Sequence, residues 1–320
     1  MSMEYLLYHV TFAGIAILLT QSLTAIWRAN MFSLGHYGFY ALGAYTSVCI
    51  AKCILRDGAW PINSFSDRAE GFAVFCLCLA AGGVVAGGCG FLAASWFGKL
   101  RDDYFAVATL LLAELIRNVV SNLELTGGGL GYEMPYLFVK NSGAERLWYV
   151  SLFAVIAILL NAAVFCVAYK LENSRLGLSI LAAKNNELAA EFAGIDVQRM
   201  RRVIFAYGTA VAGIAGALFL HFTTIVVPTD FSFTNGVPII LYVVLGRLSI
   251  VRCIVAACIM YAFYELLKLR FLGLLGDQIG NFASEGKELI LAAVLILAVV
   301  GPIYFERWRL RMKQGGVADA

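Results

Sequence analysis

The sequence predicts an all-α protein, a polytopic transmembrane bundle of about nine spans within a range of roughly 8–10. Hydrophobic residues make up 61% of the 320 residues and charged residues only 14%, whereas soluble domains hold roughly 45–50% and about 25%. The mean hydropathy is +0.80. Apolar segments close to the ~20 residues that cross a bilayer recur as far as residue 305. A soluble enzyme with a cleaved signal peptide is therefore excluded.

Nine apolar segments follow one another, separated by polar breaks and loops. They cover residues 5–27, 31–55, 72–97, 104–120, 147–169, 203–224, 236–246, 250–269 and 289–304. The first segment has no basic region and no cleavage site before or after it, so it is predicted to be a span. The Gly-rich segment 31–55 and the short segment 236–246 are predicted to be broken or re-entrant. Glycines in 72–97 and 203–224 predict close helix packing.

The placement of Lys and Arg predicts the orientation of the spans. Alternating the spans puts most cations on one side, which the positive-inside rule makes cytoplasmic. These cations are Lys99, Arg101, Lys170, Arg175, Lys184, Arg199, Arg201, Arg202, Arg247, Arg252, Arg307, Arg309, Arg311 and Lys313. The N-terminus is then outside. We expect one transmembrane domain over 1–305 with a cytoplasmic loop at 170–202, and a basic cytoplasmic tail over 306–320.

The loop at 171–202 is the longest polar break, and its centre predicts one amphipathic helix of about three turns over 179–194. Its expected apolar face, within ~60°, consists of Leu181, Leu188, Phe192 and Ile195, with Lys184, Glu187 and Glu191 on an adjacent face. Asn185 and Asn186 are expected to lower helix propensity without breaking the helix, and Gly194 to end it. Such a helix can lie on lipid or fill a protein groove. Two acids and one Lys on the polar face favour the groove.

Four other features of the sequence could carry chemistry. His36 lies in the Gly-rich segment and is either a hydrogen-bonded helix-end residue or a gating residue. Glu114 and Arg117, at i and i+3 within an apolar span, can pair as a structural contact or belong to a transport path. The Gly127–Gly131 run has no following Lys-Ser/Thr, so it is not a phosphate loop. The eight cysteines lie mostly in apolar runs without metal-ligand spacing, and no nucleotide-binding or catalytic arrangement is found.

Four stretches resemble known membrane proteins. The segment from Glu187 to Ile195 (ELAAEFAGI) resembles the EAA-type coupling segment of bacterial ABC importer permeases. The stretch 33–46 (SLGHYGFYALGAYT) is similar to a signature of branched-chain amino acid permeases, and 100–117 and 125–131 are similar to the next two signatures in the same order. The resemblance covers about residues 30–245. The chain departs from it at Asp102 and at Gly246-Arg247-Leu248-Ser249, where Gly is usual.

The resemblance implies an M-type permease subunit with the type II ABC importer fold, in the bacterial inner membrane and without enzyme activity. Implied partners are ATPase subunits, which bind the ATP, a homologous second permease and a periplasmic binding protein; no nucleic acid and no cofactor of its own are expected. Expected coupling residues are Lys184, Glu187, Ala189, Ala190, Glu191, Phe192 and Gly194. Expected path residues are Ser33, Gly35, His36, Gly38, Tyr45, Glu114 and Arg117, and the expected external turn holds Thr126, Gly127, Gly128 and Gly131.

The sequence is also compatible with other substrates and with two other classes of protein. The implied substrates are leucine, isoleucine and valine, but permeases for urea, short amides or aromatic compounds are similar. An ion-coupled secondary transporter would use Glu114 or Glu265 as an intramembrane acid and would need an internal repeat. A membrane-embedded enzyme would need clustered His or acidic residues, and the chain has three His.

Overall fold

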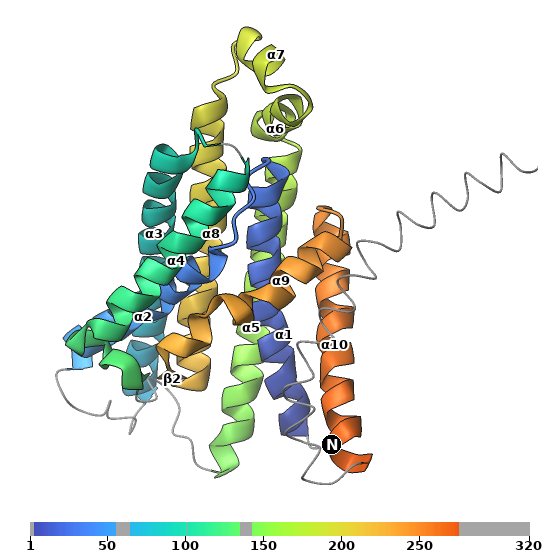
Figure 1. Ribbon diagram of the computed structural model, residues 1–320. Coiled ribbons are helices and arrows are strands. Elements are labelled where there is room, and N and C mark those ends of the chain that lie inside the picture. The colour runs from blue at the N-terminus through green and yellow to red at the C-terminus, as the bar shows by residue number, and fades with distance from the viewer. Residues whose placement is uncertain (1–2, 56–64, 101, 135–142, 275–320) are drawn as a thin grey trace, which may run out of the picture. The chain divides into compact units, whose positions relative to one another are not determined.

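The computed structural model describes residues 3–55, 65–100, 102–134 and 143–274, and these are almost entirely helical (Figure 1). The helices are α1 (Met3–Arg28), α2 (His36–Leu55), α3 (Phe65–Phe97), α4 (Asp102–Asn122), α5 (Gly143–Glu172), α6 (Arg175–Asn185), α7 (Glu187–Phe192), α8 (Val197–Thr223), α9 (Phe233–Leu245) and α10 (Ile250–Leu274), with 3-10 turns η1 (Glu124–Thr126), η2 (Gly128–Leu130) and η3 (Pro228–Phe231). The all-α prediction is confirmed. The predicted span 289–304 and the tail 306–320 lie outside the described residues.

Five helices among the described residues are long and apolar enough to cross a membrane, namely α1, α3, α4, α5 and α8. Their mean hydropathy over the best window runs from 1.5 to 2.7. Segment 31–55 begins with non-helical residues 31–35, and α2 is then continuous from His36 to Leu55, so the predicted break lies only at the start of the segment. The expected count of about nine spans stays a prediction.

The chain divides into two compact units, Met1–Ile240 and Leu241–Ala320, and the described part of the second unit is residues 241–274. In the first unit, α8 is the central helix and packs most extensively against α3, α2 and α1. Glycines permit this packing. A Cβ on Gly43 would collide with the backbone carbonyl of Gly213, and one on Gly216 would collide with the carbonyl of Tyr40. Backbone contact of this kind is how helices associate without a hydrophobic driving force.

Ion pairs and backbone pairing show which helix ends lie together in the first unit. Arg28 at the end of α1 pairs with Glu172 at the end of α5, and Glu4 pairs with Arg146 near their starts. At the α5 and α8 ends away from α6 and α7, β1 (Tyr132–Glu133) pairs antiparallel with β2 (Ile225–Val226). The helices α6 and α7 lie beyond the other end, at the top of Figure 1. Loop 171–202 and the 124–134 turn thus lie at opposite ends.

The second unit contains a strained turn between the end of α9 and the start of α10. Arg247 and Leu248 have φ angles of 50° and 61°, in the left-handed region, which costs side-chain-bearing residues roughly 1–3 kcal/mol each. The turn is closed by a hydrogen bond from the Ser249 N–H to the Gly246 carbonyl, 3.2 Å. The permease resemblance leads one to expect Gly at this turn, and the backbone keeps a Gly-type conformation although Arg and Leu occupy it.

Candidate functional site

The predicted single helix over 179–194 is wrong in one respect, because the segment forms two helices, α6 and α7, that meet at Asn186. Asn186 has extended backbone angles, φ −158° and ψ 108°, and its side-chain Oδ1 accepts a hydrogen bond from the Ala189 N–H at 3.0 Å. Asn is among the best N-cap residues and competes poorly in helix interiors. Asn186 therefore ends one helix and starts the next. We call residues 175–194 the α6–α7 element.

The predicted end of the helix at Gly194 is confirmed. Gly194 has φ +83°, and its N–H donates to the Glu191 carbonyl at 2.9 Å. The Ile195 N–H donates to the Ala190 carbonyl at 3.0 Å. A left-handed Gly whose N–H, with that of the next residue, donates to carbonyls of the last turn is a common way to close a helix C-terminus. The chain then turns into α8, whose first turn is capped by Asp196, with Oδ1 2.8 Å from the Arg199 N–H.

The outer surface of the α6–α7 element is apolar. Leu188 is 67% exposed and Phe192 is 91% exposed, with Leu178 and Leu181 also exposed. The predicted apolar face is thus present at three of its four positions. The fourth position was predicted wrongly, because the break at Asn186 and the turn at Gly194 rotate Ile195 inward. The inner cluster that Ile195 joins consists of Ala190, Val197 and Met200, with Ile180, Ala182 and Ala183 packed against it.

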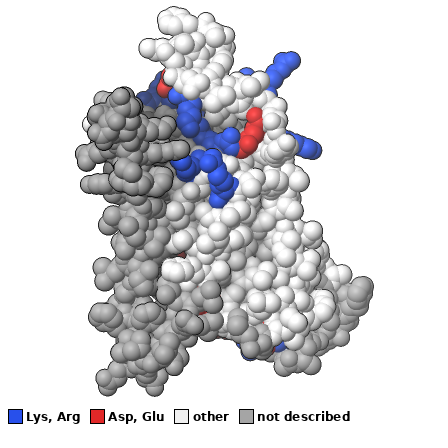
Figure 2. Space-filling model, turned by 90° about the vertical axis from the view of Figure 1, so that its right-hand side faces the viewer, with Lys and Arg blue, Asp and Glu red and all other residues white. Residues whose placement is uncertain are grey.

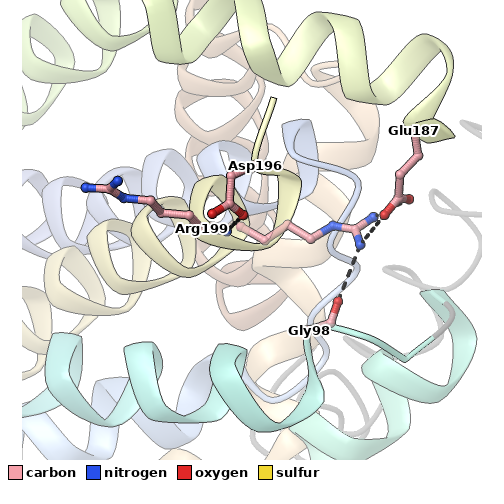
Figure 3. A network of polar contacts seen from close by, with 5 residues as sticks. Gly98, Glu187, Asp196 and Arg199 are labelled. Atoms are coloured by element: carbon pink, nitrogen blue, oxygen red, sulfur yellow. Dashed lines mark hydrogen bonds and ion pairs between the residues drawn. The ribbon is translucent and has the colours of Figure 1, made fainter. Parts of the chain in front are cut away.

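A buried arginine ties this element to the bundle (Figure 3). Arg201 on α8 is 9% exposed, and its Nη1 and Nη2 donate to the two carboxylate oxygens of Glu187, each at 2.9 Å. Its Nη1 also donates to the carbonyl oxygen of Gly98 at 3.4 Å, directly after α3. We call Glu187, Arg201 and the Gly98 carbonyl the Arg201 clasp. It joins α7, α8 and the end of α3.

The other predicted coupling residues lie at the surface, except one. Lys184, Ala189, Glu191 and Gly194 are exposed, whereas Ala190 is buried in the inner cluster. On the face drawn in Figure 2, Lys and Arg side chains gather near the top of the view, and most of the described surface below them is uncharged. Lys170, Arg175 and Lys184 are exposed cations in and directly before the α6–α7 element, and exposed apolar side chains together with cations are suited to binding a protein partner at a membrane surface.

Replacing Gly194 with Ala is expected to loosen the end of α7. A Cβ at this position meets no other atom within 4 Å, so the cost comes from the left-handed backbone alone, about 1–2 kcal/mol. Amide hydrogen exchange in peptides covering 187–195 should become about 5- to 30-fold faster. Gly129→Ala is the matched control, because Gly129 also has open space but no left-handed φ. Equal exchange in both variants would contradict the expectation.

The predicted path residues of segment 33–45 are packed inside the first unit. Ser33, His36 and Tyr45 are buried, and the His36 Nε2 lies 2.6 Å from the Ser22 hydroxyl oxygen. A Cβ on Gly35 would collide with the Thr109 carbonyl, and one on Gly38 would lie 2.6 Å from the Ala113 Cα. This stretch therefore lies directly against α4. Among the described residues, the Ser33 Oγ, His36 Nδ1 and Tyr45 hydroxyl are buried atoms without a hydrogen-bond partner.

The predicted pairing of Glu114 with Arg117 is confirmed. The Arg117 Nε donates to the Glu114 Oε2 at 2.8 Å, and Nη2 lies 2.6 Å from the same oxygen. The two side chains are 35% and 30% exposed, although they lie in a helix of membrane-spanning length. A charged pair facing lipid is costly, so this face of α4 needs water or protein against it.

The predicted turn at 126–131 is confirmed as a turn. Gly127, Gly128 and Gly131 all have positive φ, and the buried Thr126 hydroxyl donates to the Val120 and Leu123 carbonyls at 2.7 Å each. Lys52 at the end of α2 donates to the Leu125 carbonyl at 2.5 Å and lies over the Tyr132 ring at 4.5 Å. These contacts fix the turn on the ends of α2 and α4.

The sequence interpretation missed the role of Arg201. It counted Arg201 only as one of several cations that set the orientation. The partner, Glu187, is 14 positions away across a helix break and a turn, so helical periodicity cannot relate them. A weak signal exists, since the buried face of α8 (Val197, Met200, Ile204, Phe205) includes position 201 at helical spacing.

Comparisons with known proteins give a consistent picture. A family model described as "Branched-chain amino acid transport system / permease component" matches residues 5–299. The chain is 26% identical to the high-affinity branched-chain amino acid transport system permease protein LivM of Salmonella typhimurium, and equally to that of Escherichia coli; each match spans 90% of this chain and 67% of the relative. It is 28% identical to a probable LivM of Methanocaldococcus jannaschii over 42% of this chain and 38% of that protein. No solved structure matches the chain.

Proposed function

The chain belongs to the branched-chain amino acid transport permease family, and on that premise we propose that it is the M-type permease subunit of an ABC importer for leucine, isoleucine and valine. It forms one side of the translocation path in the bacterial inner membrane. The observation that carries the proposal is the α6–α7 element, whose exposed apolar tip is attached to the central helix α8 through the Glu187–Arg201 pair. A transport subunit driven by a separate enzyme needs such an attachment.

The α6–α7 element docks into a groove of an ATPase subunit, with Phe192 and Leu188 as the apolar anchors and Lys184 and Glu191 at the rim. Aromatic and aliphatic anchors inserted in a pocket are the usual source of binding energy in such interfaces. The ATPase subunits bind the ATP, and the chain itself needs no cofactor and performs no hydrolysis. The cations Lys170, Arg175 and Lys184 support a cytoplasmic location for this end, and we propose the same side for the C-terminal tail.

The substrate path runs between this subunit and a homologous second permease, and a periplasmic binding protein delivers substrate at the end that carries the 126–131 turn. Two observations support the path. Buried polar atoms of Ser33, His36 and Tyr45 have no hydrogen-bond partner among the described residues, which is unusual unless water or a ligand bonds them. The Glu114–Arg117 pair, about one third exposed, also needs a face covered by water or protein.

The test is substrate uptake into proteoliposomes that contain this chain, the second permease and the ATPase subunits, with ATP inside and the binding protein outside. Uptake of labelled leucine, isoleucine or valine that stops without ATP is expected. Urea and a short amide serve as competing substrates. Uptake of these solutes alone would move the proposal to another substrate in the same family. Uptake driven by an ion gradient without ATPase subunits would contradict it.

A further inference from the structure

We infer that Glu187 and Arg201 do not contribute to the docking surface but transmit its displacement to the bundle, as positioning residues of the coupling step. This inference rests on the proposed function, and it assigns two roles within one short element. Residues at the tip of α7 hold the partner ATPase. The Arg201 clasp passes the resulting movement to α8 and to the end of α3.

The orientation of the side chains separates these roles. Phe192 and Leu188 point away from the bundle and are largely exposed. Glu187 is the first residue of the same helix, yet both of its carboxylate oxygens are used by Arg201 in a two-bonded pair. Figure 3 shows this carboxylate directed toward the guanidinium, between α7 and α8. A partner protein that touches the tip of α7 therefore meets apolar groups, while the inner acid stays engaged within the chain.

The guanidinium connects three segments and not two. Besides Glu187, it bonds the carbonyl oxygen of Gly98 at 3.4 Å. The Gly98 N–H in turn donates to the Ala94 carbonyl at 2.9 Å. Gly98, whose own carbonyl accepts from Arg201, is therefore held against the last turn of α3. The planar fork of Arg makes such a two-bonded contact geometrically specific, which a Lys ammonium does not. A displacement of α7 must therefore move α3 and α8 together or break the clasp.

Burial makes breaking the clasp costly. The Arg201 side chain is 11% exposed, against 42% for Glu187. Removing the acid would leave a largely buried cation without its counter-charge, the costly way to disrupt a buried pair. The helices that the clasp joins are also in direct backbone contact farther along, where a Cβ on Gly213 of α8 would collide with the Gly82 carbonyl of α3. The α3–α8 pair can therefore carry the movement into the membrane as a stiff unit.

The experiment compares Glu187→Gln and Arg201→Gln with the parent chain in the complete transporter. Co-purification of the ATPase subunits, the rate of ATP hydrolysis and the rate of substrate uptake are measured on the same preparations. Assembled complexes that still hydrolyse ATP are expected, with substrate transported per ATP reduced about 2- to 30-fold. Arg201→Lys should recover part of this ratio only, because it keeps the charge but loses the fork. The exchanged pair E187R/R201E should recover more than either of its single changes.

Arg199→Gln is the matched control, because Arg199 is an exposed cation two positions before Arg201 on the same helix. This change should leave the amount of substrate transported per ATP unchanged. If Arg201→Gln does not accumulate in the membrane, the Glu187→Gln variant alone tests the inference. Glu187 is partly exposed, so its replacement by Gln should disturb folding less. An unchanged ratio in an assembled Glu187→Gln complex would overturn the inference. Loss of the ATPase subunits from this variant would also overturn it, by making Glu187 a docking residue. A parent complex that never binds an ATPase would instead reject the proposed function.

Discussion

Replacing Phe192 with Asp is expected to release the ATPase subunits from the complex and to abolish ATP-driven uptake. Phe192 is 91% exposed at the tip of α7, so the change should not disturb the fold of the chain. In a groove, the same side chain would contribute as an anchor, and anchor residues cost about 2–4 kcal/mol or more when lost. The carboxylate adds an unpaired charge in an apolar pocket. Binding should weaken by about 30-fold to about 1,000-fold.

The measurement is the amount of ATPase subunit that co-purifies with the tagged permease, together with its apparent Kd from titration in detergent or nanodiscs. Phe192→Leu is the control, because it keeps an apolar anchor of similar reach and should retain most of the binding. Leu188→Asp should act in the same direction, since Leu188 is 67% exposed on the same short helix. Undiminished co-purification with Phe192→Asp would remove α7 from the docking surface.

The sequence was sufficient for the helical architecture because hydrophobic length is a strong and local signal. The boundaries of α1 and α4 agree with the apolar segments to within two residues, and α8 ends within one residue of its segment's end but begins six residues earlier, at Val197. The break before His36 was also predictable, because Gly35 and its neighbours do not favour a continuous helix. Gly194 was predictable for the same reason, as a Gly at the end of an apolar-periodic stretch is a common C-terminal signal.

The details of the α6–α7 element were not predictable from periodicity. Whether Asn186 stays in a helix or caps one depends on a difference of roughly 1 kcal/mol between two hydrogen-bonding choices, and the packing of Ala190 and Ile195 against Val197 and Met200 decides it. The contact of Arg201 with Glu187 and Gly98 joins residues distant in sequence. Such a contact exists only once the turn at Gly194 has folded α7 back onto α8, so no local pattern encodes it.

Replacing Gly43 with Val is expected to prevent the first unit from assembling. Gly43 lies where α2 crosses α8, and any Cβ there would collide with the backbone carbonyl of Gly213. Backbone atoms cannot move aside as a flexible side chain can, so α2 and α8 would have to separate. Separation would also open the neighbouring contacts of Gly82 with Gly43 and of Gly216 with Tyr40. Overpacking a well-packed core typically costs about 1–3 kcal/mol, and a backbone collision between two central helices belongs at or above the top of that range.

Gly88→Val is the matched control for this change, because Gly88 lies in α3 and a Cβ there meets no atom within 4 Å. Both variants add the same side chain to a Gly in an apolar helix, so helix propensity and hydrophobicity change equally. The measurement is the yield of monodisperse protein from membranes and its thermal midpoint in detergent. Gly43→Val should lose most of its yield or melt several degrees lower, and Gly88→Val should behave like the parent chain. Equal behaviour would mean that propensity, and not the α2–α8 contact, governs these positions, and the crossing at Gly43 and Gly213 would then not hold the bundle together.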